Sequence, residues 1–375
     1  MQGQILKIHS DFYYVKFADN SKLTECKVRE VLKKQKTKIF VGDFVECGEM
    51  NSARNTAVIE KVLPRKNFLT RPSVANVDQV VIISSIKEPD LDFTQLNRYI
   101  SFAKHHKIKT KLCFNKNDLS QDDTIIEKVF EIYEPLGFEI IFTSALENIG
   151  LEDFVGILKN KNTAFCGNTG VGKSSLINAI SPGLNIKTKQ VSEKTSRGVH
   201  TTRHCEIIEI ANSKQLTVNG KQKPAIASGS EAIQRKARST TRIIDTPGFS
   251  NLKFDFLLPT QVDELFDEIK KYKSGCKFTD CLHIDEEGCN VLENIDKIDI
   301  SRYQSYLAFL NEAQEYKDKI STESIKKETS QKEGLNKVVA KISTRKRQAS
   351  RNTIKQQIYK DMDTNLDKAL QENEQ

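Results

Sequence analysis

The sequence predicts a multidomain chain: a small β-barrel, then a doubly wound α/β domain, then an α-helical segment with a basic tail that is helical or disordered. Three observations predict this order. Short strand-like runs separated by turn signals fill about the first sixty residues, strands then alternate with helices, and helical patterns follow residue 259. We expect four parts, at 1–72, 73–257, 258–316 and 317–375.

The first part has the pattern of a five-stranded barrel. Strands are expected at Ile5–Ile8, Tyr13–Phe17, Thr24–Val28, Asp43–Cys47 and Ala57–Val62. About five strands in about sixty residues are typical of the OB-fold, a barrel that often binds nucleic acid. The excess of basic side chains and the aromatic run Phe12–Tyr14 leave two interpretations open. They form either an ordinary core with a solvated surface or a face that stacks bases and binds phosphates.

After a linker at 64–72, apolar strands alternate with helices. The expected strands are Val77–Ser85, Lys109–Phe114, Glu139–Thr143, Thr163–Cys166 and Arg242–Ile244. The expected helices are Phe93–His106, Asp122–Leu136, Leu151–Leu158 and Ser175–Ile180. Buried parallel strands with crossover helices predict a doubly wound sheet.

A complete phosphate-binding loop, G-x-x-x-x-G-K-S, lies between the strand that ends at Cys166 and the helix that follows. Its backbone N–H groups converge on phosphates, Lys173 meets the β- and γ-phosphates, and the Ser174 hydroxyl binds Mg²⁺. The expected nucleotide contacts are Gly167, Asn168, Thr169, Gly170, Val171, Gly172, Lys173, Ser174 and Ser175.

Two further motifs point to a guanine base. N-K-N-D follows one strand, and T-S-A follows the next. The Asp118 carboxylate can accept both N1–H and N2–H₂ of guanine, a donor pair that adenine lacks, and Lys116 can lie along the ring. Alone, N-K-N-D could cap a helix, but its place at a strand end favours GTP over ATP. The expected base contacts are Asn115, Lys116, Asn117, Asp118, Thr143, Ser144 and Ala145.

Two segments after the phosphate loop are expected to sense the γ-phosphate. D-T-P-G at 245–248 would supply Asp245 behind the Mg²⁺ ion and the Gly248 N–H to the phosphate, although alone it could be a plain turn. In G-V-H-T-T, Thr201 or Thr202 would complete the Mg²⁺ shell only with GTP bound. His200 is either catalytic, with Lys173, Asp245 and Thr201, or a surface side chain.

The base motif precedes the phosphate loop by about fifty residues, whereas ordinary GTPases carry it after the loop. With the barrel, the G-x-H-T-T segment and a later Cys/His cluster, this order resembles the circularly permuted ribosome small-subunit-dependent GTPase A family over residues 1 to about 312. The resemblance implies cytoplasmic GTP hydrolysis that is stimulated by the small ribosomal subunit and coupled to its late maturation. The basic insertion at 211–242 and the long tail beyond 320 depart from that pattern.

Phe249 leaves the catalytic group open. It stands where Ras-like enzymes place a water-orienting Gln, and an apolar side chain cannot orient water. We therefore expect slow intrinsic turnover and dependence on a partner, with His200 or a ribosomal group substituting for the Gln. The alternative is a non-catalytic rRNA-binding assembly factor that GTP only stabilises. A tRNA- or membrane-associated permuted GTPase is disfavoured by the barrel.

A Cys/His cluster follows D-T-P-G, with the spacing C-x₄-C-x-H-x₅-C. Three thiolates and one imidazole form a closed tetrahedral set for a structural Zn²⁺ ion. Because the common C-x₂-C knuckle is missing, spacing alone leaves unpaired loop cysteines as the alternative. The resemblance implies zinc, because that family carries it at the positions that match Cys276, Cys281, His283 and Cys289. Four other cysteines fall in strand-like runs, as buried hydrophobes do: Cys26, Cys47, Cys113 and Cys166.

Charge and hydropathy limit which classes of protein and partner fit this chain. No apolar run reaches the roughly 18 residues that span a bilayer, and no signal-peptide pattern is visible, so we expect a cytoplasmic protein without a membrane partner. We also expect a monomer. Basic runs at 211–242 and 337–360 are either solvated faces or phosphate contacts, and their near lack of acids favours rRNA. Helices are expected at Pro259–Tyr272 and Ser301–Tyr316.

Overall fold

The structure is a computed structural model that describes residues 1–181, 205–210, 241–245 and 252–332, apart from positions 19, 21, 36, 52 and 121. Met1–Lys319 form one compact unit, and Ile320–Gln375 belong to a second. All the contacts described below lie within the first unit.

The N-terminal strands close into a barrel, as predicted. Its strands are β1 (Gln2–His9), β2 (Phe12–Phe17), β3 (Thr24–Val28), β4 (Phe44–Cys47) and β5 (Thr56–Val62), with the short helix α1 (Glu30–Lys34) after β3. They pair in the order β1-β2-β3-β5-β4, and β4 returns to pair with β1, which is the closure of an OB-fold. Inward-facing side chains fill its core, including Ile5, Val15, Cys26, Val45 and Ile59.

The segment expected as a plain linker at 64–72 is partly regular. It contains β6 (Phe68–Thr70), which pairs with β7 (Ser73–Ala75) in an antiparallel hairpin. The hairpin is fixed to the barrel because the Ala75 N–H donates to the Val41 carbonyl at 2.9 Å. At the next residue, Gly42 has φ +89°, and a Cβ there would lie 2.0 Å from the Ala75 carbonyl oxygen. Only glycine fits this close approach.

The central sheet is doubly wound, as predicted. Its strands are β8 (Gln79–Ser85), β9 (Lys109–Asn115), β10 (Glu139–Phe142), β11 (Asn162–Cys166), β12 (Glu206–Ile210) and β13 (Thr241–Asp245). They lie in the order β10-β9-β8-β11-β13-β12, in which only β12 is antiparallel to its neighbour. Lys7 of β1 pairs with Glu206 of β12, so barrel and sheet are hydrogen-bonded in continuous order.

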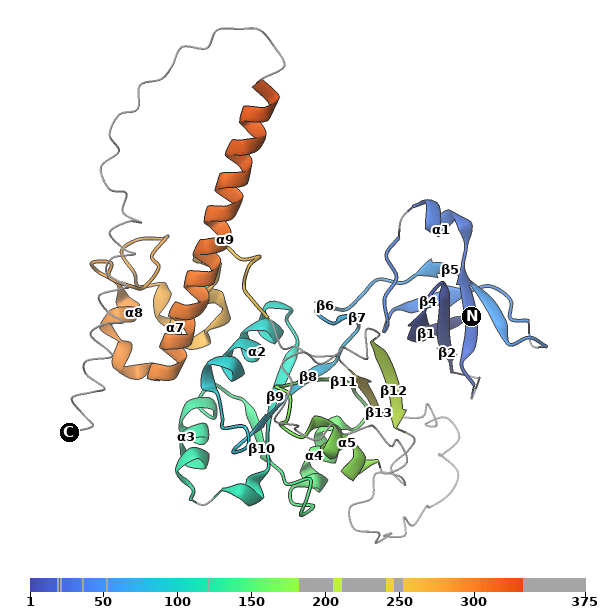
Figure 1. Cartoon of the computed structure of the whole chain (residues 1–375), viewed down its shortest axis with the longest axis horizontal. Coiled ribbons are helices and arrows are strands. Elements are labelled where there is room, and N and C mark those ends of the chain that lie inside the picture. Colours follow the sequence, from blue (N-terminus) through green and yellow to red (C-terminus); the bar gives the residue numbers. More distant parts are fainter. Residues whose placement is uncertain are drawn as a thin grey trace, which may run out of the picture. The chain divides into compact units, whose positions relative to one another are not determined.

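Helices cover both faces of this sheet (Figure 1). They are α2 (Phe93–His105), α3 (Thr124–Tyr133), α4 (Leu151–Leu158) and α5 (Lys173–Ile180), with the short 3₁₀ helix η1 (Asn117–Leu119) after β9. Alternate side chains of β8 face opposite layers: Val80 and Ile82 share a core with α2 and α3, whereas Val81 and Ile83 share one with α4 and α5. β8 is therefore buried on both faces, which explains its continuous apolar run.

The C-terminal helices differ from two expectations. They are η3 (Pro259–Gln261), η4 (Asp263–Leu265), α7 (Asp267–Lys273), α8 (Asn290–Glu293), η5 (Ile295–Lys297) and α9 (Ile300–Lys332). The single helix expected at 259–272 is wrong: Phe266 is extended (φ −121°) and fully buried, so packing of its ring interrupts the helix. The helix expected at 301–316 continues to Lys332, through a stretch that contains no Gly or Pro to end it.

Two glycines with positive φ form a matched pair for a stability test. A Cβ on Gly42 would touch the Ala75 backbone, whereas a Cβ on Gly137, which has φ +78°, would meet nothing within 4 Å. The left-handed backbone costs both alanine variants about 1–2 kcal/mol, but only Gly42→Ala also clashes with backbone, which adds about 1–3 kcal/mol. Calorimetry should show a melting temperature at least about 2 °C lower for Gly42→Ala than for Gly137→Ala. Equal losses would contradict the close approach.

Candidate functional site

The sheet has a topological switch point between β8 and β11. The chain runs from β8 outward through β9 to β10, then returns to the other side of β8 as β11. Open α/β sheets bind ligands outside the carboxyl ends of their strands at such a reversal. Asn115 ends β9, Thr143 follows β10 and Gly167 follows β11, so motifs separated in the sequence meet at one edge of the sheet.

Asn115 joins three of these motifs through its buried amide. Its Nδ2 donates to the Val171 carbonyl at 2.9 Å, and its Oδ1 accepts from Thr143 Oγ1 and from the Ala145 N–H, both at 3.2 Å. Gly172 lies directly against it, because a Cβ on Gly172 would be 2.2 Å from Nδ2. Asn115 thus braces the site from inside, and contact of the T-S-A segment with the guanine base stays a prediction.

The base motif continues as a tight turn after β9. Lys116 has a left-handed backbone (φ 61°) and its Nζ donates to the Glu88 carbonyl, while the Asn117 N–H donates to the Thr143 carbonyl at 3.1 Å. This turn places Asp118 in η1, where its side chain is half-buried. Ser144 closes the neighbouring T-S-A loop through paired backbone bonds with Ile149. The side chain assigned to read guanine therefore stands on a braced turn.

The phosphate loop packs directly onto the sheet. Gly167 has φ +148°, and a Cβ there would lie 2.0 Å from the Ile83 carbonyl oxygen. Lys173, the first residue of α5, folds back over the loop: its Nζ donates to the carbonyls of Gly167 at 2.8 Å and Asn168 at 2.7 Å. These bonds hold a positive charge at the positive end of the α5 dipole, the arrangement that favours bound phosphate.

The remaining predicted nucleotide residues divide into two groups. Ser174 is half-buried in the first turn of α5, whereas Thr169 and Ser175 are exposed. Asp245 ends β13, which pairs with β11 directly before the phosphate loop. The predicted γ-phosphate and switch residues lie outside the described part of the chain: His200, Thr201, Thr202, Gly248 and Phe249.

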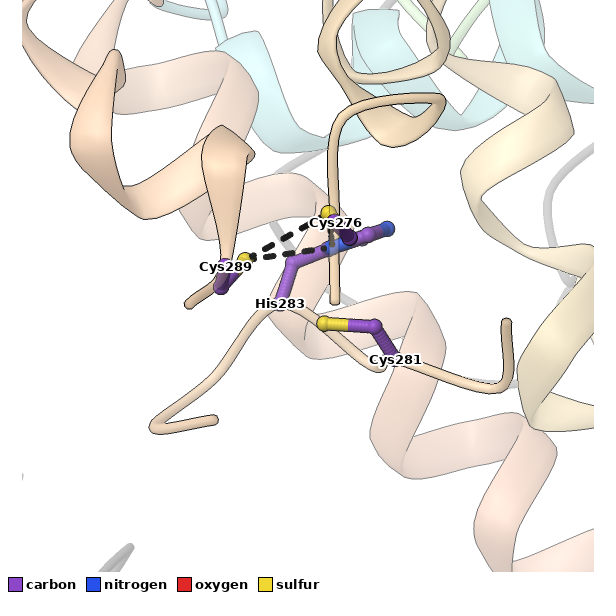
Figure 2. Close-up of side chains that lie close together, drawn as sticks. All are labelled: Cys276, Cys281, His283 and Cys289. Carbon is purple, nitrogen blue, oxygen red and sulfur yellow. Dashed lines mark hydrogen bonds between the residues drawn. The ribbon is translucent and has the colours of Figure 1, made fainter. Parts of the chain in front are cut away.

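A second site lies among the C-terminal helices. Figure 2 shows four side chains turned toward one another, from Cys276, Cys281, His283 and Cys289, whose ligand atoms all lie within 4.8 Å. Nδ1 of His283 is 3.4 Å from Cys289 Sγ and 3.7 Å from Cys276 Sγ, and those sulfurs are 3.9 Å apart. Tetrahedral Zn²⁺, with bonds of about 2.3 Å to sulfur and about 2.0 Å to nitrogen, separates its ligand atoms by about 3.5–3.8 Å. The donor set and spacing fit zinc.

A buried carboxylate faces the histidine of the cluster. Nε2 of His283 lies 3.6 Å from the buried carboxylate of Asp263, which also pairs with Lys273 at 2.6 Å. Burial alone would raise the pKa of Asp263, but contacts with His283 and Lys273 lower it, so the carboxylate stays ionised. The Tyr303 hydroxyl fixes the His283 carbonyl at 2.7 Å. Metal-binding histidines commonly have such a carboxylate on their other nitrogen.

Burial raises the pKa of the Cys281 and Cys289 thiols, so without a cation these groups are neutral. A bound Zn²⁺ ion would reverse this preference, because it stabilises thiolates directly. The four strand cysteines differ: each is buried in a barrel or sheet core, as the sequence predicted. Only the C-terminal cysteines therefore gather around a common centre among the described residues.

Helix α2 carries site contacts that sequence reasoning did not single out. The Tyr99 hydroxyl donates to the side chain of Asn168 in the phosphate loop at 2.7 Å, and Asn97 bonds to Ser305 of α9 at 2.9 Å. No local pattern marks these residues, because their partners lie far away in the sequence.

Within the part of the chain that the structure describes, no helix is long and apolar enough to cross a membrane.

Comparison with known families matches both the barrel and the central domain. Residues 2–58 match the RsgA N-terminal domain, and residues 62–217 match the RsgA GTPase family. Residues 162–326 match a third family, described as 50S ribosome-binding GTPase. That third match begins at β11, directly before the phosphate loop, and leaves out the base motif that the permuted order places earlier.

Whole-chain relatives extend this match. The small ribosomal subunit biogenesis GTPase RsgA of Alkaliphilus metalliredigens is 35% identical over 313 residues, which cover 83% of this chain and 97% of that protein. The same-named protein of Clostridium acetobutylicum is also 35% identical over 313 residues, with the same coverage. The crystal structure of YjeQ from Thermotoga maritima is 30% identical, with a TM-score of 0.67 over 84% of this chain and 98% of that one. YloQ, a circularly permuted GTPase, is 29% identical, with a TM-score of 0.64 over 84% and 95%. The chain therefore belongs to the RsgA family of circularly permuted GTPases.

Proposed function

We propose that this GTPase is a switch that binds the small ribosomal subunit during late maturation and leaves it when GTP is hydrolysed. The observation that carries the proposal is the meeting of base motif and phosphate loop through Asn115, in a chain whose relatives are named small ribosomal subunit biogenesis GTPases. Both parts are needed: the geometry supports a guanine-nucleotide site, and the relatives' name supports the partner.

In the proposed site, Asp118 reads the guanine edge, Lys116 lies along the ring and Lys173 neutralises the phosphates. Mg²⁺ enters with GTP and is held by Ser174 together with Thr201 or Thr202, with Asp245 behind it. Phe249 cannot orient water, so we assign that role to His200 or to a group of the subunit. If the subunit supplies that group, GTP hydrolysis depends on binding of this protein to the small subunit.

We further propose that one Zn²⁺ ion is held by the C-terminal cluster, where it supplies structural cross-linking. All four protein ligands are present, which leaves no position open for water. The segment between α7 and α9 has little regular structure, so a metal staple offsets its small core. In this proposal the GTPase domain is residues 73–257. The domains before and after it, at 1–72 and 258–316, bind rRNA, and a basic extension follows at 317–375. We expect a monomer that acts in the cytoplasm, where subunits mature.

Subunit-stimulated turnover is the first test. Purified small subunits should raise steady-state phosphate release severalfold, because the chain lacks its own Gln after D-x-x-G. Lys173→Ala should abolish release with and without subunits while the circular dichroism spectrum is retained. An equal rate of phosphate release with and without small subunits would contradict the proposed partner. A chain that binds GTP but releases no phosphate would instead be a non-catalytic assembly factor.

Base specificity tests the role of Asp118. Asp118→Asn replaces one acceptor oxygen with a donor, which suits xanthine, whose C2 carries oxygen. GTP affinity should fall about 10–100-fold, the loss expected for a charged hydrogen bond, and affinity for xanthosine triphosphate should rise. The matched control is the neighbouring Asp122→Asn, exposed and outside the motif, which should bind GTP normally. Unchanged GTP affinity in Asp118→Asn would refute the assigned role.

Metal content tests the cluster. The purified chain should contain about one zinc ion, and Cys289→Ser should lose it and melt at a lower temperature, since a closed site needs every ligand. Cys205→Ser, at a half-buried cysteine outside the cluster, should keep the metal. Equal zinc content in all three proteins, measured by atomic emission, would rule out the proposed ligand set.

A further inference from the structure

Three consecutive residues of helix α2, none of them in a nucleotide motif, contact three different parts of the chain. Asn97 bonds to α9, Arg98 bonds to the segment after β13, and Tyr99 bonds to the phosphate loop. Successive side chains of an α-helix point about 100° apart, so a single turn can reach all three. Helix α2 therefore lies between the proposed nucleotide site and the C-terminal helices.

Tyr99 supports the phosphate loop from behind. Its side chain is 2% exposed, and its hydroxyl donates to Asn168 Oδ1 at 2.7 Å. Burial raises the pKa of Tyr99, so the phenol keeps its proton. The carbonyl of Asn168 in turn accepts from Lys173 Nζ. The hydroxyl thus fixes the residue whose backbone holds the ammonium in place.

Asn97 fastens the same helix to α9. It is fully buried, and its Oδ1 accepts from Tyr133 and from Arg302, both at 2.8 Å. Its Nδ2 donates to Ser305 Oγ at 2.9 Å. Arg302 is itself anchored by Glu268 of α7 at 2.6 Å. Because unmade bonds of a buried amide are costly, α2 and α9 cannot slide past each other without losing several bonds at once.

Arg98 adds a connection to the chain that leaves the D-T-P-G segment. Its Nη1 donates to the Leu252 carbonyl at 3.1 Å and to Glu312 of α9 at 2.8 Å. The same carboxylate accepts from the Phe254 N–H at 2.9 Å. The guanidinium also lies 4.6 Å from the centre of the Phe309 ring. Arg98 therefore holds this segment and α9 together on the side of α2 next to Asn97.

We propose that Tyr99 is a positioning residue for the phosphate loop, and that α2 couples this loop to α9 through Asn97 and Tyr99. The proposal rests on the proposed GTP site. Asn97 and Tyr99 are two positions apart on one rigid helix, so a displacement of α9 moves the side chain that holds Asn168. By reciprocity, filling the phosphate loop favours one position of α9. A partner that pulls on the C-terminal helices would thereby change nucleotide affinity.

The test is the dissociation constant of the full-length chain for GDP, with a fluorescent GDP analogue as the probe. Tyr99→Phe removes only the hydroxyl and should weaken binding at least threefold. Asn168→Ala removes the same bond from its other end, so adding Tyr99→Phe to Asn168→Ala should weaken binding no further than Asn168→Ala alone does. Ser305→Ala, on α9 and outside the nucleotide site, should weaken binding about two- to fivefold in the wild-type background and not at all in the Tyr99→Phe background.

Gln304→Ala is the matched control, exposed on α9 beside Ser305, and should bind GDP as the wild type does. Thermal melts of each variant separate lost binding from lost folding. Less than a threefold effect of Tyr99→Phe would overturn the positioning role. The coupling would be overturned if Ser305→Ala left GDP affinity unchanged in the wild-type background. It would also be overturned if Ser305→Ala weakened GDP binding as much in the Tyr99→Phe background as in the wild type. A wild-type chain that binds no GDP would instead refute the proposed GTP site.

Discussion

The hydrogen bond from Asn115 to the Val171 carbonyl joins two halves of a site that the chain order separates. A parallel sheet makes this possible, because strand neighbours are set by pairing and not by sequence order: β9, β8 and β11 lie side by side although a long stretch of chain separates β9 from β11. Permutation therefore leaves the pocket intact and changes only which segment follows it. After β13 the chain enters the C-terminal helices directly, past Leu252 and Phe254.

That change of connection places the C-terminal helices directly after the D-T-P-G segment in the chain. In the described residues they meet the GTPase domain through buried polar groups, with Asn97 and Arg302 at the centre. Polar contacts of this kind have strict geometry, so they favour one arrangement and break cooperatively. The proposed zinc site lies in the same helical unit, where Asp263 orients His283 while pairing with Lys273 of α7. The Cys/His cluster, the C-terminal helices and the phosphate loop are thereby linked by short contacts.

The sequence was sufficient for the features that depend on local pattern. The barrel strands and the doubly wound sheet follow from alternation and apolar runs, and the cysteine cluster was expected from its spacing together with the family resemblance; the structure agrees with each. Sequence reasoning failed where tertiary packing decides the backbone. Phe266 interrupts an otherwise helical pattern because its ring is buried. The 64–72 segment forms one strand of a hairpin whose other strand pairs with Val41 of the barrel through Val74. The contacts of Tyr99 and Asn97 join distant parts of the chain and leave no local signature.

The central claim is that the inverted halves form one nucleotide pocket through Asn115. Its most direct test is the GTP affinity of Asn115→Asp, which keeps the shape but replaces the donor to Val171 with an oxygen. A buried carboxylate facing a carbonyl is strongly unfavourable, so affinity should fall at least about thirtyfold, while zinc content remains that of the wild type. An Asn115→Asp chain that binds GTP like the wild type would contradict the account.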